Sequence, residues 1–410
     1  MNIRIINNFN KDIEKEDTEM VERKGIGHPD SLADLTAETF SNKYSKYCLK
    51  NFSTILNHGV DRIVLSGAKA DISFGKAKVL KPINVYLFGK MVLEVGEAKI
   101  NISKIFRESV NYVFTRIFKN KEILKYINYV IDINDGIGLE HPREFYMPGT
   151  IVNFKKIKDL EVANDTVMCS AYAGYSRAES LAIGIENYIN SNNFKSKFSE
   201  TGYDVKVLIV RVKDEFDITV CLPFIARYTK SFPFYKHRLT EAKEDIREKI
   251  AKLIKGRKFS LYVNTKDRAC YGYITVFGTA LDKGDYGIVG RGNKYNGVIS
   301  LSREASPEAV SGKNPIHHVG KLYNIISQDI ANEIYKKFRV ENYINIATKN
   351  GLPLINPPYI VVKLCGGSIN KSIIESIINK KIKNIKKYTN KIVRLDPVYE
   401  FHVLKSIKML

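Results

Sequence analysis

The chain has 410 residues, of which 44% are hydrophobic, and this is enough for two or three domains with substantial cores. Its 65 lysine and arginine residues exceed the 44 aspartate and glutamate residues, for a net charge of +21, but the basic residues are spread along the whole sequence. That spread, with no RNP, KH or zinc-finger pattern, argues against a nucleic-acid-binding protein.

The cysteines and the N-terminal segment indicate the cellular compartment. Five cysteines lie far apart, and none has zinc-ligand or C-x-x-C spacing, as is typical of reduced thiols in a cytoplasm. The first residues lack the apolar core of a signal peptide, and no apolar run approaches the length of a membrane span. We therefore expect a cytoplasmic protein with no membrane partner.

Apolar periodicity predicts helices and strands that alternate along the chain without a Ser/Pro-rich linker. The first third is predicted to contain a helix over 31–50, strands over 62–66 and 83–88, a helix over 105–118 and a strand over 129–132. The middle is predicted to contain a strand over 167–171, a helix over 178–188, a hairpin of strands 205–212 and 217–222, a helix over 236–255, and strands over 259–263 and 273–278. The last third is predicted to contain a helix over 319–337, a strand over 359–364, and one helix over 371–388 with isoleucines along one stripe. The pattern predicts an α/β fold with mixed sheets in several layers.

The segment 22–31 (ERKGIGHPDS) combines bases, glycines, His28 and Asp30 ahead of the first predicted helix. Glycines let a backbone approach a ligand closely, and a helix N-terminus attracts anions. A histidine can share a proton, and an aspartate can hold Mg²⁺. The combination favours a polyphosphate site. The alternative is structural, because 31–34 (SLAD) fits a capping box in which Asp30 or Ser31 only starts the helix.

Two later segments also favour an anionic ligand. Residues 284–293 hold four glycines around Asp285 and Arg291, but not in the order of a dinucleotide fingerprint. Arg291 can clamp a phosphate, and Asp285 can hold a metal or an amine. Residues 308–321 place Lys313 and Lys321 around a Ser-Gly turn, but this is no Walker A loop because its leading glycine is absent. The alternative for the glycine-rich segment is a mobile surface loop.

Three polar segments lie close to predicted strands, and each is open to a structural or a functional interpretation. They are 164–166 (NDT), 57–61 (NHGVD) and the group from Asp132 to His141, which includes Gly136 and Gly138. Loops that follow strands are where α/β proteins place ligands.

Taken together, four blocks of the chain resemble the archaeal-type methionine adenosyltransferases (S-adenosylmethionine synthetases). The blocks are 22–34 (ERKGIGHPDSLAD), 163–166 (ANDT), 290–297 (GRGNKYNG) and 311–324 (SGKNPIHHVGKLYN). The resemblance implies three similar α/β domains about a pseudo-threefold axis, which we place near 1–135, 136–270 and 271–410 with segments interleaved between them. It also implies a homodimer with active sites at the interface. The implied reaction joins the sulfur of L-methionine to C5′ of ATP and cleaves the expelled triphosphate to pyrophosphate and phosphate.

By the same resemblance, His28 lies beside the C5′–O bond and stabilises the departing oxygen, and Asp30 ligates Mg²⁺. Arg291 and Lys313 contact phosphates, with Lys321 as a further candidate. K⁺ is an additional candidate cofactor. The remaining candidates fall into two groups. Those expected to bind ATP or phosphate are Gly136, Gly138, Asp285 and Ser311, and those expected to contact methionine or another substrate group are His58, Asp61 and Asp165.

The chain departs from the family pattern at three places. Residues 136–141 read GIGLEH where the family usually has Gly-x-Gly-Ser-x-Asp, so a hydroxyl and a carboxylate expected near ATP are absent. Tyr286 stands where an acid is common, and Lys69 stands where a histidine is usual. These departures keep open a second hypothesis, a catalytically weakened paralogue that still binds nucleotide.

Overall fold

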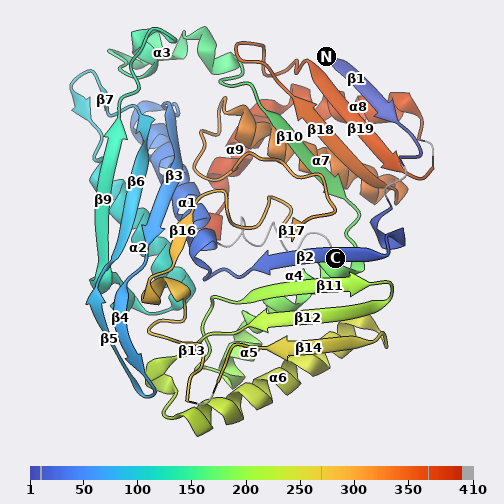
Figure 1. The fold of residues 1–410 in the computed structure, drawn as a ribbon. Helices are drawn as coiled ribbons and strands as arrows, with labels where there is room; N and C mark the ends of the chain where they lie inside the picture. Colours follow the sequence, from blue (N-terminus) through green and yellow to red (C-terminus); the bar gives the residue numbers. More distant parts are fainter. Residues whose placement is uncertain (10–11, 269, 368, 399–410) are drawn as a thin grey trace.

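Three sheets, each backed by helices, make up the protein in the computed structural model, which describes residues 1–9, 12–268, 270–367 and 369–398 (Figure 1). Each sheet packs its helices around a separate cluster of buried apolar side chains. The expectation of a mixed α/β fold with several mixed sheets is confirmed.

The first sheet has the strand order β16-β3-β6-β9. Its strands are β3 (His58–Ser66), β6 (Ile83–Met91), β9 (Ile127–Asn134) and β16 (Tyr286–Ile288), and its helices are α1 (Pro29–Phe52) and α2 (Ile102–Phe118). Rings such as Phe40, Tyr44, Phe106 and Phe114 are fully buried between the helices and the sheet. Two small hairpins extend this unit, β4 (Lys69–Ser73) with β5 (Lys76–Lys81), and β7 (Glu94–Val95) with β8 (Ala98–Lys99).

The second sheet has the order β14-β12-β11-β2-β17. Its strands are β2 (Thr18–Lys24), β11 (Lys206–Val212), β12 (Glu215–Cys221), β14 (Phe259–Val263) and β17 (Ile299–Ser300), and its helices are α4 (Arg177–Ile189), α5 (Asn192–Lys197) and α6 (Phe232–Ile254). Helix α4 begins with a capping box between Ser176 and Glu179, which satisfies backbone N–H groups at its start. The short strands β13 (Phe224–Ile225) and β15 (Ile274–Thr275) pair beside this sheet.

The third sheet has the order β1-β19-β18-β10. Its strands are β1 (Asn2–Ile6), β10 (Met168–Ala173), β18 (Glu341–Ala347) and β19 (Tyr359–Cys365), and its helices are α7 (Val319–Phe338), α8 (Lys371–Lys383) and α9 (Ile385–Arg394). The first strand of the chain pairs parallel to β19, so this sheet joins the two ends of the described chain. Helix α3 (Ile151–Lys155) lies in the connection that leads from β9 to β10.

Segments far apart in the sequence contribute to each sheet. The first sheet takes β16, and the second takes β2, from two segments that the sequence singled out for chemistry. Strand β2 leads directly into the 25–28 turn, β16 lies within the glycine-rich segment, and β17 follows that segment and pairs with β2. The sheets therefore hold these loops at the junction between units. The division near residues 135 and 270 and the pseudo-threefold axis stay predictions.

Most predicted elements are confirmed within a few residues, and two differ. The strand expected over 273–278 is reduced to β15 (Ile274–Thr275). The single helix expected over 371–388 is two helices, because the backbone of Asn384 leaves the helical conformation between α8 and α9. The isoleucine stripe of α8 faces the core, where Ile374 and Ile378 are fully buried.

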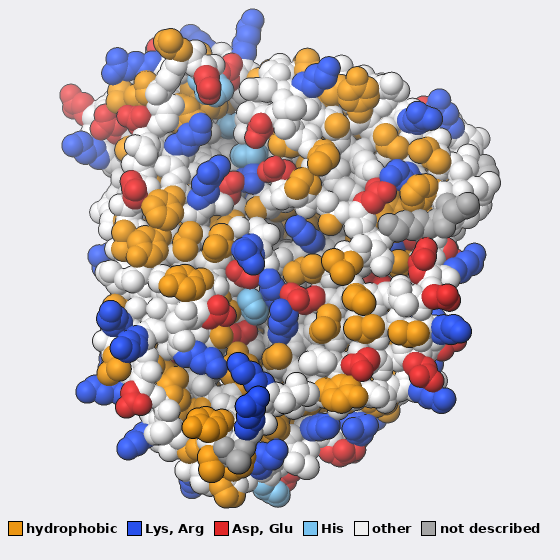
Figure 2. All heavy atoms as spheres, in the orientation of Figure 1, with side chains coloured by type: hydrophobic (Ala, Val, Ile, Leu, Met, Phe, Trp, Pro, Cys, Tyr) orange, Lys and Arg blue, Asp and Glu red, His pale blue; other side chains and the backbone are white. Residues whose placement is uncertain are grey.

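The faces of the sheets that point away from the helices carry exposed apolar side chains. Met20 on β2, Leu208 on β11, Met168 on β10 and Tyr359 on β19 are exposed, and they alternate with buried neighbours along each strand. Figure 2 shows hydrophobic side chains gathered over the strands on this side of the molecule. Within the described ranges, no helix combines the length and apolarity needed to cross a membrane.

Candidate active site

His28 is the residue that starts helix α1, between the end of β2 and Pro29 at the first helical position. Its Nδ1 accepts a hydrogen bond of 3.1 Å from the backbone N–H of Asp30, which is the contact of an N-cap. The capping-box alternative is therefore wrong, since Ser31 lies inside the helix and its buried Oγ has no hydrogen-bond partner. The helix start instead fixes the orientation of the imidazole.

The imidazole of His28 is neutral at physiological pH. Its pKa is lowered to about 4, mainly by burial; the Asp30 carboxylate opposes this shift, and the nearby Lys24 and Lys206 ammonium groups add to it. Because Nδ1 accepts from Asp30, the proton of the neutral ring is assigned to Nε2. The side chain is thus arranged as a fixed hydrogen-bond donor.

Asp30 joins helix α1 to the glycine-rich loop. One carboxylate oxygen accepts from the N–H of Ile288 at 3.0 Å, and the other accepts from Lys24 Nζ at 2.9 Å. Lys24 Nζ also donates to the carbonyl of Arg291 at 2.6 Å. Both carboxylate oxygens of Asp30 therefore already have protein partners.

The glycine-rich loop packs directly on the start of α1. A Cβ at Gly287 would lie 2.1 Å from the carbonyl oxygen of Pro29, so only glycine fits at this position. Asp34 accepts from the N–H of Gly290 at 2.9 Å, one turn further along the helix. At least one of the glycines thus serves contact between two protein segments, while the side chains of Asp285 and Arg291 are exposed.

A cavity of about 550 Å³ opens beside His28. Asp285 lines it, together with Asp204, Lys206 and Lys283, which the sequence had not singled out. Burial raises the pKa of the Asp204 carboxyl to about 7, although the N–H of Ala280 donates to it at 2.7 Å. Asp204 and Lys206 lie shortly after Gly202, where β11 begins. A glycine followed by polar residues is typical of a loop at a strand end, and this was the sequence signal that could have identified them.

The residues present fit a divalent cation of the Mg²⁺ type. Within the described residues, no group of three or more histidine, cysteine, aspartate or glutamate side chains could hold a metal ion. Mg²⁺ does not require such a group, because it is usually held by one or two carboxylates together with water and substrate phosphates. The exposed Asp285 supplies hard oxygen donors of that kind, and Asp30 would supply one on giving up its contact to Lys24.

A second group of predicted residues lies on the Ser-Gly-Lys turn, next to strand β3. Gly312 has a φ of +77°, and a Cβ there would lie 2.6 Å from the carbonyl oxygen of Val60, so this position requires glycine. The N–H of Val60 donates to the carbonyl of Gly312 at 3.0 Å, which holds the turn against β3. Lys313 follows, and its Nζ lies 2.8 Å from Asp61 and 3.3 Å from Glu308. Burial opposes ionisation of Asp61, but the Lys313 ammonium outweighs it and lowers the pKa of that carboxyl.

Asp61 and Lys313 line a larger cavity of about 1020 Å³. Asp165, Gly136 and His58 also line it, so the structure brings together five of the predicted residues from four separate segments. The lining includes His317 and His318 as well, and His318 caps helix α7 as His28 caps α1.

His58 has protein partners on both ring nitrogens. Nε2 lies 2.8 Å from Ser41 Oγ, and Nδ1 lies 3.0 Å from the carbonyl oxygen of Leu56. Burial lowers its pKa to about 3, so the ring is neutral and packs at 4.8 Å from the ring of Tyr44. These contacts favour the structural interpretation of His58.

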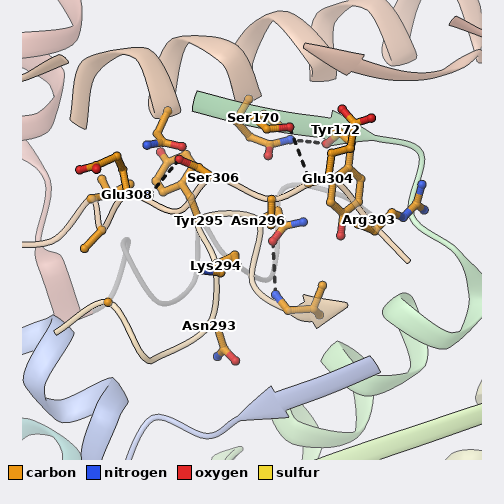
Figure 3. Close-up of a pocket in the computed structure, with 18 of the residues that line it drawn as sticks. Ser170, Tyr172, Asn293, Lys294, Tyr295, Asn296, Arg303, Glu304, Ser306 and Glu308 are labelled. Carbon is orange, nitrogen blue, oxygen red and sulfur yellow. Dashed lines mark hydrogen bonds between the residues drawn. The ribbon is translucent and has the colours of Figure 1, made fainter. Parts of the chain in front are cut away.

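Lys321 and Ser311 lie away from both cavities. Lys321 is fully buried, and its Nζ lies 2.8 and 2.7 Å from the two carboxylate oxygens of Glu38. Ser311 lines a separate internal cavity of about 40 Å³, where the segment of Ser306 and Glu308 faces that of Asn293 and Asn296 (Figure 3). Gly138 is exposed, and no atom lies within 4 Å of the position of an added Cβ.

A family model described as S-adenosylmethionine synthetase (AdoMet synthetase) matches residues 1–396. The S-adenosylmethionine synthase of Pyrobaculum aerophilum is 33% identical over 388 residues, which cover 92% of this chain and 94% of that protein. The corresponding protein of Saccharolobus islandicus strain L.S.2.15 is 32% identical over 405 residues, with coverage of 96% and 98%. A solved structure titled as an unusual S-adenosylmethionine synthetase from Campylobacter jejuni aligns with this chain at a TM-score of 0.53 and 14% sequence identity. The alignment covers 95% of this chain and 98% of that one, and this likeness supports the fold.

Proposed function

Because the chain belongs to the S-adenosylmethionine synthetase family, a family of adenosyl transferases, we propose that it joins the sulfur of L-methionine to C5′ of ATP. The triphosphate is displaced intact and then cleaved to pyrophosphate and phosphate. The observation that carries this proposal is the neutral, helix-capping His28, which lines a cavity with basic and acidic side chains.

His28 acts as a hydrogen-bond donor to the leaving group. As the C5′–O bond breaks, negative charge grows on the oxygen of the triphosphate. A donor that is already oriented and partly desolvated stabilises that charge without having to reorganise. The lowered pKa keeps the ring neutral, so the Nε2 proton is held in place for donation.

Basic side chains supply the remaining positive charge. Lys206 and Lys283 line the His28 cavity, and Lys313 lines the larger one. We place Arg291 with them as a phosphate contact. Mg²⁺, held by Asp30 and Asp285 when bound, supplies positive charge toward the phosphate oxygens. K⁺ remains a candidate, tested by replacing it with Na⁺ at constant ionic strength.

The active site is completed in a homodimer. Seven of the predicted residues line two cavities that share no lining residue, with His28 and Asp285 in one and five residues that include Lys313 and Asp61 in the other. The exposed apolar side chains on the outer sheet faces, including Met20, Leu208 and Tyr359, are suited to burial against a second copy. We propose that a two-fold dimer formed through these faces brings the His28 cavity of one copy to the Lys313 cavity of the other.

Mass spectrometry tests the activity directly, by detecting S-adenosylmethionine after incubation with ATP, L-methionine, Mg²⁺ and K⁺, with phosphate and pyrophosphate measured in parallel. His28→Asn keeps a capping side chain but lacks the Nε2–H, so we expect kcat to fall about 10²–10³-fold with little loss of stability. His28→Ala loses the cap as well, at about 1 kcal/mol. The exposed His237, changed to alanine, is the matched control. A His28→Asn variant with native kcat would contradict the role of His28.

The weakened paralogue is retained as a second candidate because of residues 136–141. His141 in this segment is used locally, since it lies 2.8 Å from Asp159 and packs at 4.6 Å from Phe145. A native chain that is folded and binds ATP by calorimetry, yet forms no S-adenosylmethionine, would favour this candidate over the enzyme.

A further inference from the structure

A basic cavity of about 520 Å³ lies outside the site described above, between the C-terminal end of α2 and helix α5. Lys119, Lys195 and Arg227 line it, together with aromatic rings that include Phe118 and Tyr203. Its described lining contains no aspartate or glutamate. The cavity is therefore positively charged on one side and aromatic on another.

Lys195 is the unusual member of this cavity. The side chain is buried, and its Nζ donates to Thr201 Oγ1 at 3.1 Å and to the carbonyl of Gly202 at 2.5 Å. In the part of the chain that the structure describes, no carboxylate lies within ion-pair distance of this ammonium. An ammonium has three donors, so one N–H is left over. Burial lowers the pKa of Lys195 to about 7, and the more distant Glu186 and Glu200 carboxylates oppose this shift without forming an ion pair with it.

The aromatic walls determine what kind of anion fits. The ring of Tyr203 lies 4.9 Å from Lys195 Nζ and 6.0 Å from Lys119 Nζ, and it meets Phe118 edge to face. A second planar group can pack against such rings while an acidic group reaches the lysines. A planar organic ring that bears a phosphate or carboxylate combines both features.

The segment 201–204 separates this cavity from the one beside His28. Thr201 and Tyr203 line the basic cavity, whereas Asp204 lines the His28 cavity. The carbonyl of Tyr203 accepts from the N–H of Gly27 at 3.1 Å, in the turn that positions His28. Any shift of Tyr203 on binding is therefore passed directly to the turn before His28.

We propose that this cavity is an effector site for a small planar organic anion, and that its occupation changes the rate of the reaction through the 201–204 segment. The regulatory part of the proposal rests on the proposed function, and the binding part does not.

Pyridoxal 5′-phosphate tests binding, because it carries a planar ring, a phosphate and an aldehyde. Lys195 Nζ attacks the aldehyde carbon and water leaves, which forms an imine; added borohydride delivers a hydride that reduces the imine to a stable amine. Peptide mass spectrometry then locates the label. We expect Lys195 to be labelled at least about tenfold more than the exposed neighbour Lys197, whose amine stays protonated. Equal labelling of the two lysines would overturn the proposal.

A protection experiment distinguishes an anion-binding site from a lysine that is only chemically reactive. Phenyl phosphate and benzoate are added before labelling, and inorganic phosphate serves as the comparison without a ring. Protection of Lys195 from labelling by phenyl phosphate or benzoate, but not by inorganic phosphate at the same concentration, supports binding of a planar organic anion. The comparison of the two aromatic compounds identifies which acidic group is preferred. Failure of both aromatic compounds to protect would overturn it.

Activity measurements test the regulatory part. Lys195→Met removes the buried ammonium, and Arg227→Gln changes only a rim side chain, so at least the second variant keeps the fold. We expect Arg227→Gln to retain the basal rate within about twofold, and we expect both variants to lose the response of the rate to phenyl phosphate. A response that is equal in native and variant proteins would overturn the regulatory part. Should the native chain form no product, the protection assay still decides whether the anion binds.

Discussion

The buried pair of Lys321 and Glu38 gives the sharpest test of how the structure assigns the predicted residues. Lys321 is 0% exposed and Glu38 is 4% exposed, and the ammonium contacts both carboxylate oxygens within 2.8 Å. Burial lowers the pKa of Lys321, and Glu38 opposes this effect. Glu38 also accepts a hydrogen bond from the N–H of Gly312 at 3.0 Å, so the ion pair helps to hold the Ser-Gly-Lys turn in place.

Replacing Lys321 with methionine leaves the carboxylate of Glu38 buried without its counterion. Removing one partner of a buried ion pair typically costs about 3–5 kcal/mol, and we expect a loss of that size in the free energy of unfolding. The double variant Glu38→Gln/Lys321→Met removes both charges, while the glutamine oxygen can still accept from Gly312. We therefore expect the double variant to be more stable than the single one.

Urea unfolding followed by circular dichroism measures this difference, with the Michaelis constant for ATP as the second readout. Lys371→Met is the matched control, since this exposed lysine pairs with Glu375 at 3.6 Å on the surface of α8. We expect the control to change stability by less than about 0.5 kcal/mol. If Lys321→Met raises the Michaelis constant for ATP with stability unchanged, Lys321 binds phosphate and the structural assignment is refuted.

Two further predictions concern a turn and a titrating carboxyl. Gly312→Ala places a Cβ 2.6 Å from the carbonyl oxygen of Val60 at a residue with positive φ, so we expect urea unfolding to report a free energy of unfolding that is lower by about 1–3 kcal/mol. The control Gly138→Ala, whose added Cβ meets no atom within 4 Å, is expected to change stability little. Equal losses in the two variants would contradict this prediction. Burial raises the pKa of Asp204 to about 7, so the folded state keeps a proton that the unfolded chain releases, and this group lowers stability as pH rises from about 4 to about 7. Asp204→Asn removes that dependence, and we expect thermal or urea unfolding to find it more stable than the native chain by about 1–3 kcal/mol near pH 8 and equal to it near pH 4; a pH-independent difference would contradict the assignment.

Elements with strong local patterns were predictable from the sequence. Helix α1 carries apolar residues near helical spacing, helix α7 has an apolar stripe, and the strands β11 and β12 are apolar runs joined by a short turn. Strand β2 was missed because it carries charged residues at inward positions, where Arg23 pairs with Glu186 and Glu19 pairs with Arg211. A buried charge is acceptable only when its partner is present, and those partners lie more than 150 residues away. The local sequence does not reveal them.

The sequence by itself determined the types of residue available for chemistry and the family to which the chain belongs, because motifs are short and keep their spacing along the chain. Only the tertiary structure decided which of them meet. It placed Lys313 against Asp61, 252 positions away, and Lys321 against Glu38, 283 positions away, and it set His28 and Asp285 in a different cavity from Lys313 and Asp61. Local propensity acts over a few residues, whereas these contacts depend on how three sheets pack and on which buried charges find a partner.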